Sequence, residues 1–129
     1  MLEQYKLVQS HAINASTTPD VGADVDLAKY TNCMGRNIMA VATIIPTGAD
    51  TDETVDVKIQ QSSSTTDGDF ADISGATFTQ VTQESTAALE AITFRATKRY
   101  IRAYATIAGT TPGFALNTAF LLEERGSST

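Results

Sequence analysis

The segment Arg99–Leu122 constrains the fold most strongly, because it has the pattern of two long β-strands joined by a turn. Apolar and polar residues alternate along its first half, and this period of two gives a strand one buried and one exposed face. Gly109, Pro112 and Gly113 separate the halves, and such residues favour chain reversal over continued pairing. The segment therefore predicts a hairpin, and its partners must come from the rest of the chain, because an isolated hairpin is only marginally stable. One side of its second strand carries a single row: Phe114, Leu116, Thr118, Phe120 and Leu122.

Shorter segments with strand patterns precede this hairpin. Arg36–Ile45 is apolar on both faces, as expected of a central strand covered on both sides or facing a subunit contact. Thr54–Gln60 alternates cleanly, and the Ser, Thr, Asp and Gly cluster of Ser62–Asp69 indicates a turn. About seven to nine short strands at a spacing of roughly 8–12 residues, without a long helix, predict an all-β fold. We expect an antiparallel β-sandwich, or a jelly-roll-like arrangement of it.

A chain of 129 residues fits one domain with a real core. We expect residues 1–15 to be an N-terminal strand or an arm lying on a neighbour, 16–125 a single β-sandwich domain, and 126–129 a flexible C-terminal tail. The N-terminus lacks the basic segment and unbroken apolar core of a signal peptide. The longest apolar-leaning run, Ile38–Ile45, is far shorter than the ~20 residues that span a bilayer. The sequence predicts a soluble protein without a membrane partner, made in a cytoplasm.

The net charge and the scarcity of Cys and His argue against several classes of function. A formal charge of −6 argues against nucleic acid as a partner, since phosphate binding needs a clustered basic surface. Cys33 is the single cysteine, so an intramolecular disulfide and a Cys-rich zinc site are excluded. His11 is the single histidine and has no nucleophile motif near it. We predict no enzymatic activity and no cofactor.

Acidic residues gather in two turn-rich segments. If these loops converged, their carboxylates could hold Ca²⁺, which takes six to eight oxygen ligands. The spacing of an EF-hand is missing, so solvated turn acids are the preferred interpretation. The calcium candidates are Asp50, Asp52, Asp67 and Asp69, with Glu53 and Asp72 beside them.

A basic group stands out in this acidic chain. Two interpretations stay open: it could meet an acidic surface of a partner, or it could neutralise neighbouring Asp and Glu across a sheet. The group consists of Arg95, Lys98, Arg99 and Arg102.

The last three-fifths of the chain resembles small proteins encoded beside the major capsid gene of tailed bacteriophages. In that family a strand runs into an SSxxxDGxF turn and then a DIxGAxF strand, and an RYIRA strand is followed by a GTTPGF turn. The matching segments are Val55–Gln61, Ser63–Phe70, Asp72–Phe78, Arg99–Ala103 and Gly109–Phe114.

The resemblance implies a capsid decoration (cement) protein, a β-sandwich or jelly roll on the outer surface of the phage head. Such a protein stabilises contacts between major capsid protein subunits and often acts as a homotrimer. On this hypothesis we expect the N-terminal segment and the basic group Arg95, Lys98, Arg99 and Arg102 to form the contacts. The N-terminal contact residues are Leu2, Tyr5, Leu7, His11 and Ile13.

Two alternatives remain. A carbohydrate- or host-surface-binding module on the same fold would use the loops Thr47–Glu53 and Ser62–Asp69, with or without calcium, because sandwiches serve unrelated functions. Another head or tail component of the virion would also fit the resemblance.

Overall fold

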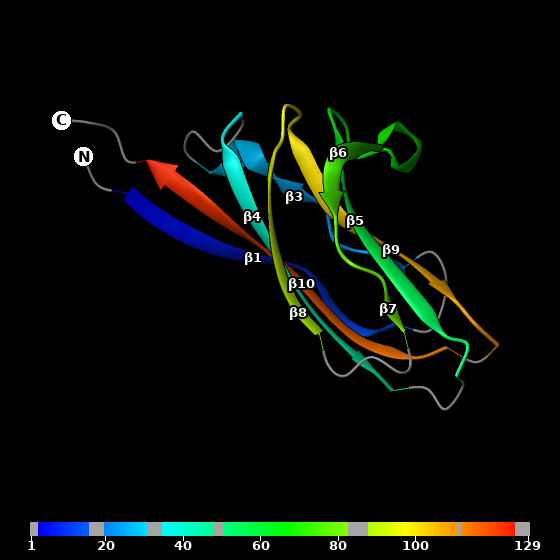
Figure 1. Cartoon of the computed structure of the whole chain (residues 1–129). Coiled ribbons are helices and arrows are strands. Elements are labelled where there is room, and N and C mark those ends of the chain that lie inside the picture. The colour runs from blue at the N-terminus through cyan, green and yellow to red at the C-terminus, as the bar shows by residue number, and fades with distance from the viewer. Residues whose placement is uncertain are drawn as a thin grey trace.

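The computed structural model describes residues 3–15, 20–30, 35–47, 51–82, 88–110 and 112–125, and these form two packed antiparallel sheets (Figure 1). Sheet A has the order β1 (Glu3–Ala15), β10 (Phe114–Arg125), β4 (Asn37–Pro46) and β8 (Ala88–Arg95). Sheet B has the order β2 (Asp20–Val21), β9 (Tyr100–Ala108), β5 (Thr54–Ser62) and β6 (Ala71–Thr77). In sheet B, β3 (Val25–Asp26) also pairs with β9, and β7 (Val81–Thr82) also pairs with β5.

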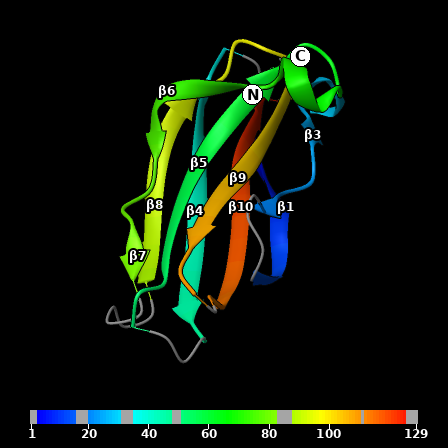
Figure 2. The same ribbon diagram turned by 90° about the vertical axis from the view of Figure 1, so that its right-hand side faces the viewer.

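The predicted all-β sandwich is confirmed. Every described strand pair is antiparallel, and Figure 2 shows sheet B in front of sheet A. The helices in the described part of the chain are two three-residue 3₁₀ turns, η1 (Leu27–Lys29) and η2 (Asp67–Asp69). Among the described residues, no helix has the length and hydropathy to cross a bilayer.

The core lies between one face of each sheet. The predicted row of β10 is buried, from Phe114 to Leu122, and it packs with the inward rows of β4, β5 and β9. Small residues such as Ala103 and Ala105 at the centre of β9 leave room for large side chains from the opposite sheet. Phe120 meets Phe94 edge to face, with ring centroids 5.9 Å apart.

The predicted hairpin is wrong, because β9 and β10 lie in opposite sheets. β9 pairs with β5, whereas β10 pairs with β1 and β4. The chain therefore passes from one sheet to the other between β9 and β10. Alternation with a period of two shows which side of a strand is buried. A hairpin within one sheet and a crossing between two sheets give the same alternation, so the pattern could not distinguish them.

Glu53, directly before β5, contacts this crossing. Its side chain is fully buried, and its Oε2 accepts a hydrogen bond of 2.8 Å from the N–H of Gly113. Asp52 beside it accepts from the N–H of Thr110 at 3.3 Å and from its hydroxyl at 2.9 Å. Gly109 has φ +129°, and an added Cβ there would lie 2.8 Å from the Cα of Glu53, so glycine is required at this approach.

Replacing Glu53 should show how much this bond contributes. We expect Glu53→Ala to lower the free energy of unfolding by about 2 kcal/mol, because the half-buried N–H of Gly113 loses its charged acceptor. Glu53→Gln keeps an amide oxygen as acceptor, so its free energy of unfolding should fall by clearly less than that of Glu53→Ala. Urea unfolding of both variants measures the difference, and equal losses would contradict the role of the Gly113 bond.

Candidate binding faces of the sandwich

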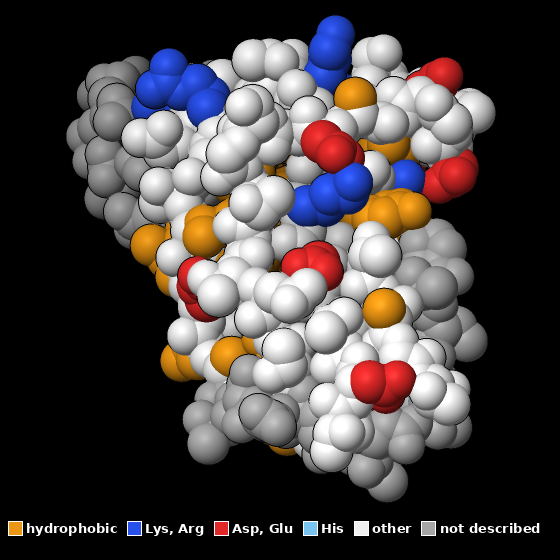
Figure 3. Space-filling model, turned by 45° about the vertical axis from the view of Figure 1, so that its right-hand side comes forward, with side chains coloured by type: hydrophobic (Ala, Val, Ile, Leu, Met, Phe, Trp, Pro, Cys, Tyr) orange, Lys and Arg blue, Asp and Glu red, His pale blue; other side chains and the backbone are white. Residues whose placement is uncertain are grey.

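The outer face of sheet B carries a connected set of polar and aromatic side chains. Lys58 lies opposite Tyr104 in the β5–β9 register, and its ammonium group is 5.1 Å from the centre of that ring. Lys58 Nζ also contacts Asp72 Oδ2 at 2.8 Å, and Gln60 Nε2 donates to Asp72 Oδ1 at 3.0 Å. These bonds lower the pKa of Asp72, with Lys58 as the main cause. Figure 3 shows basic and acidic side chains interspersed on the face it presents.

Arg102 is buried in this set, with an exposed fraction of 5%. Its Nε donates to Gln60 Oε1 at 2.9 Å, and a terminal nitrogen donates to Asp67 Oδ1 at 2.8 Å. Its guanidinium lies 3.9 Å from the ring centre of Phe70. Arg102 therefore holds the turn that contains η2 against the sheet.

Arg99 is also engaged with a neighbouring acid. Its Nε and a terminal nitrogen bond the two carboxylate oxygens of Asp26 at 2.8 and 2.9 Å. Asp26 also accepts from the N–H of Ala28 at 3.0 Å and thereby caps η1. The hydrogen bond from Arg99 is the main reason that the pKa of Asp26 falls to about 2. Asp26 in turn raises the pKa of Arg99.

Two members of the basic group predicted from the sequence are paired with acids. Arg99 pairs with Asp26 of β3 and Arg102 with Asp67 of η2, in line with the interpretation that the group neutralises neighbouring acids. Arg95 lies exposed at the end of β8 in sheet A, and Lys98 is exposed in the turn that leads to β9.

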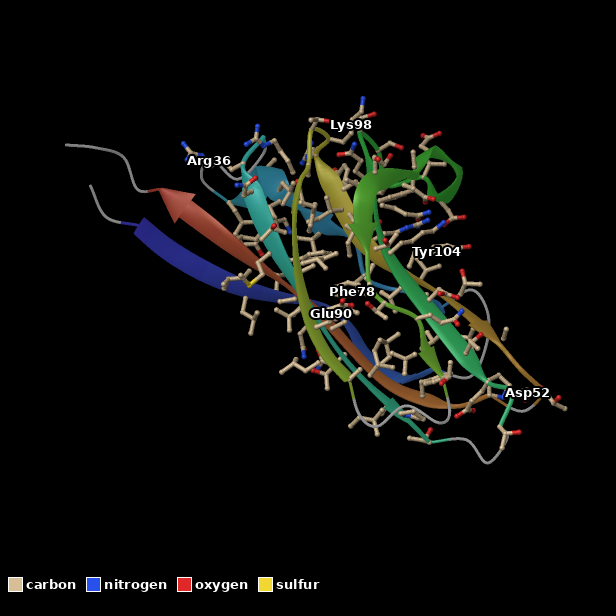
Figure 4. The ribbon with its side chains drawn as sticks, in the orientation of Figure 1. Arg36, Asp52, Phe78, Glu90, Lys98 and Tyr104 are labelled. Carbon is tan, nitrogen blue, oxygen red and sulfur yellow. The ribbon has the colours of Figure 1, made fainter. Side chains whose placement is uncertain are left out.

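The loops with the calcium candidates do not converge. Asp52 precedes β5, while Asp67 and Asp69 follow its other end, so nine strand residues, about 30 Å, separate them. Figure 4 shows Asp52 at the end of the sandwich away from Lys98. Asp69 accepts a bond of 2.7 Å from the hydroxyl of Ser64, and Thr110 lowers the pKa of Asp52. Asp50 lies outside the described residues, and the described residues contain no group of three or more His, Cys, Asp or Glu that could hold a metal ion.

The N-terminal segment forms an edge strand. β1 pairs with β10 from Glu3 to Ala15, with one irregularity between Gln9 and His11. Leu2 lies outside the described residues, as do the side chains of Tyr5, His11 and Ile13. Leu7 is described, and 68% of its surface is exposed.

The outer face of sheet A carries several exposed apolar side chains among neutral polar ones, with Arg95 at the end of β8. The register aligns Leu7, Leu121, Met39 and Thr93 in one row, and Gln9, Ala119, Val41 and Ala91 in the next. Leu89 is 74% exposed, Ile45 43% and Met39 37%, and both rows are free of charged side chains. The second apolar side of Arg36–Ile45 signalled part of this face in the sequence, but the contributions of Leu89 and Leu121 depend on a register that the sequence does not reveal. We call Leu7, Met39, Val41, Ile45, Leu89, Ala91, Ala115, Ala119 and Leu121 the apolar face.

No known family model matches this chain, and no curated protein matches it. Among solved structures, the chain is similar to a crystal structure of endo-1,4-β-D-xylanase 10B from Clostridium thermocellum. That structure contains the CBM22-1 and GH10 modules in complex with xylohexaose. The TM-score is 0.47 at 13% identity, over 95% of this chain and 28% of that chain. The chain thus spans less than a third of that protein's length. A likeness of this degree carries no information on the function of this chain.

The Asp26–Arg99 pair predicts a specific acid sensitivity. The pKa of Asp26 is about 2 in the folded protein, below its ordinary value of 3.8, so the pair stabilises the fold above about pH 4. That contribution is lost as the pH falls toward 2. We expect the stability difference between the natural protein and Asp26→Asn to shrink over this window in thermal melts. Arg99→Gln should behave in the same way, and a difference that stays constant with pH would contradict the assignment.

Proposed function

We propose that this chain is a non-catalytic docking module that binds other protein subunits through the apolar face. The observation that carries the proposal is the exposure of four large hydrophobic side chains on one sheet: Leu7, Met39, Ile45 and Leu89. Large hydrophobic side chains that are exposed together on one face of a domain indicate an interaction site.

The scarcity of charge around these side chains supports a protein partner. The chain carries a net charge of −6, whereas the two rows that contain Met39 and Val41 hold no charged side chain. A surface without charged groups loses little hydration energy when a partner covers it. Apolar strands at the centre of the sheet, such as β4, then contribute to the core with one face and to the contact with the other.

The particular role we propose is capsid decoration on the outside of a tailed-phage head. Support comes from the sequence resemblance, whose segments build β5, β6, the start of β9 and the crossing to β10. In this role the partner is the major capsid protein, and the module itself is a homo-oligomer, a trimer in the resembling family. Many copies on one shell would make weak individual contacts effective.

Cosedimentation with undecorated, expanded phage heads tests this role. We expect saturable binding of the natural protein, and a loss of affinity of at least about tenfold for Met39→Asp, because burying an unpaired carboxylate in a contact is costly. Val21→Asp is the matched control, since Val21 is exposed to the same extent, 37%, but belongs to sheet B. Equal losses in both variants, or no binding by a folded protein, would overturn the proposal.

A carbohydrate-binding module is the second candidate function. The observation that favours it is the polar and aromatic outer face of sheet B around Tyr104. The loops Thr47–Glu53 and Ser62–Asp69 cannot form one site, because they lie at opposite ends of β5. A sugar site would therefore lie on the face of the sheet and would need no calcium.

Chelation tests whether the fold contains a calcium site. We expect EDTA to leave the melting temperature unchanged, because Asp52 and Asp69 already accept bonds from Thr110 and Ser64 and lie at opposite ends of β5. Differential scanning calorimetry with EDTA and with added CaCl₂ measures this. A melting temperature that falls with EDTA and recovers with calcium would show that a metal site exists after all.

A further inference from the structure

A hollow of about 380 Å³ opens on the outer face of sheet B, where the edge strand is interrupted. β6 ends at Thr77, which pairs with Lys58, and β7 begins at Val81, which pairs with Val55. The connection between them leaves the ladder but stays close, because the N–H of Phe78 bonds the carbonyl of Val57 at 2.9 Å. The hollow is lined by Asp56, Val57, Lys58, Thr77, Phe78 and Thr106.

The walls of the hollow are held in place by bonds from outside it. Glu90 of β8 accepts from the N–H of Thr79 at 2.6 Å and from its hydroxyl at 2.9 Å, so the opposite sheet fixes the connection (Figure 4). Gln80 Nε2 donates to Asp56 Oδ2 at 2.9 Å, and Asp72 holds Lys58. Side chains that are already ordered lose little entropy when a ligand binds.

The lining selects a chemical class of ligand. Asp56 and Lys58 lie two residues apart on the same face of β5. The carboxylate repels an anionic ligand and the ammonium group repels a cationic one, so the pair favours a neutral ligand. Thr77 and Thr106 add hydroxyls that both donate and accept, while Phe78 and Val57 are buried and apolar. The accessible groups suit a neutral ligand that is rich in hydroxyls.

We propose that this hollow binds a neutral sugar unit of a polysaccharide or glycan. A sugar carries several hydroxyls that both donate and accept, and the polar side chains of Asp56, Lys58, Thr77 and Thr106 in the lining can meet them. Its hydroxyls match Asp56 as acceptor and Lys58 as donor. The volume lies at the lower end of the ~300–1,000 Å³ found for ligand pockets, as expected for a small unit.

This inference gives the second candidate function a place and a ligand class, and it rests on that function. It is independent of docking through the apolar face, because the two sites lie on the outer faces of different sheets. Loss of sugar binding with intact cosedimentation on phage heads would therefore separate the two.

Affinity gel electrophoresis of the full chain tests the proposal. The gels contain neutral polysaccharides, namely glucan, mannan, galactan or xylan, or polygalacturonate as an acidic comparison. We expect at least one neutral polysaccharide to retard the natural protein. The double variant Asp56→Ala/Thr106→Ala should bind about tenfold more weakly, since each lost hydrogen bond removes a factor of roughly three.

Thr93→Ala is the matched control, because it removes an exposed strand threonine from the outer face of sheet A. It should migrate like the natural protein, and circular dichroism confirms that all variants are folded. Retardation by no neutral polysaccharide, retardation by polygalacturonate alone, or equal retardation of the double variant would each overturn the proposal.

Discussion

The sandwich depends on a buried carboxylate that joins its two layers. β9 and β10 are interior strands of opposite sheets and follow one another in the chain, with Gly109 and Gly113 at the two ends of the link. Glu53 accepts the N–H of Gly113 and packs under Gly109, so the start of β5 determines where the chain leaves sheet B. Because β10 pairs with both β1 and β4, its placement by this link also determines the alignment of most of sheet A.

Local patterns in the sequence predicted the strands well but not their partners. The alternation in Thr54–Gln60 and the row from Phe114 to Leu122 correspond to β5 and to the buried side of β10. The same alternation could not distinguish a hairpin from a crossing between layers. The deciding contact, Glu53 to Gly113, joins residues 60 positions apart, and no local period records it.

The candidate sites depend even more on distant pairing. Arg95 and Arg102 are near in sequence, yet they lie in different sheets, because the turn with Lys98 and Arg99 leads from β8 in sheet A to β9 in sheet B. The apolar face shows the reverse case. Leu7, Met39 and Leu121 are far apart in sequence, and the pairing of the strands brings them into one row. The hollow of sheet B likewise depends on where β6 ends and β7 begins. The amino-acid sequence did not predict this interruption of the edge strand.

The two outer faces of the sandwich point in opposite directions, and this fixes how the molecule is oriented once it is held. Packed sheets are separated by only about 10 Å, so a surface that covers sheet A leaves sheet B uppermost on the far side. Every copy seated in this way would have the same side up. A layer of such molecules would turn a single shallow hollow into a regular lattice of identical outward-facing hollows, whose spacing is set by the support beneath and not by the module itself.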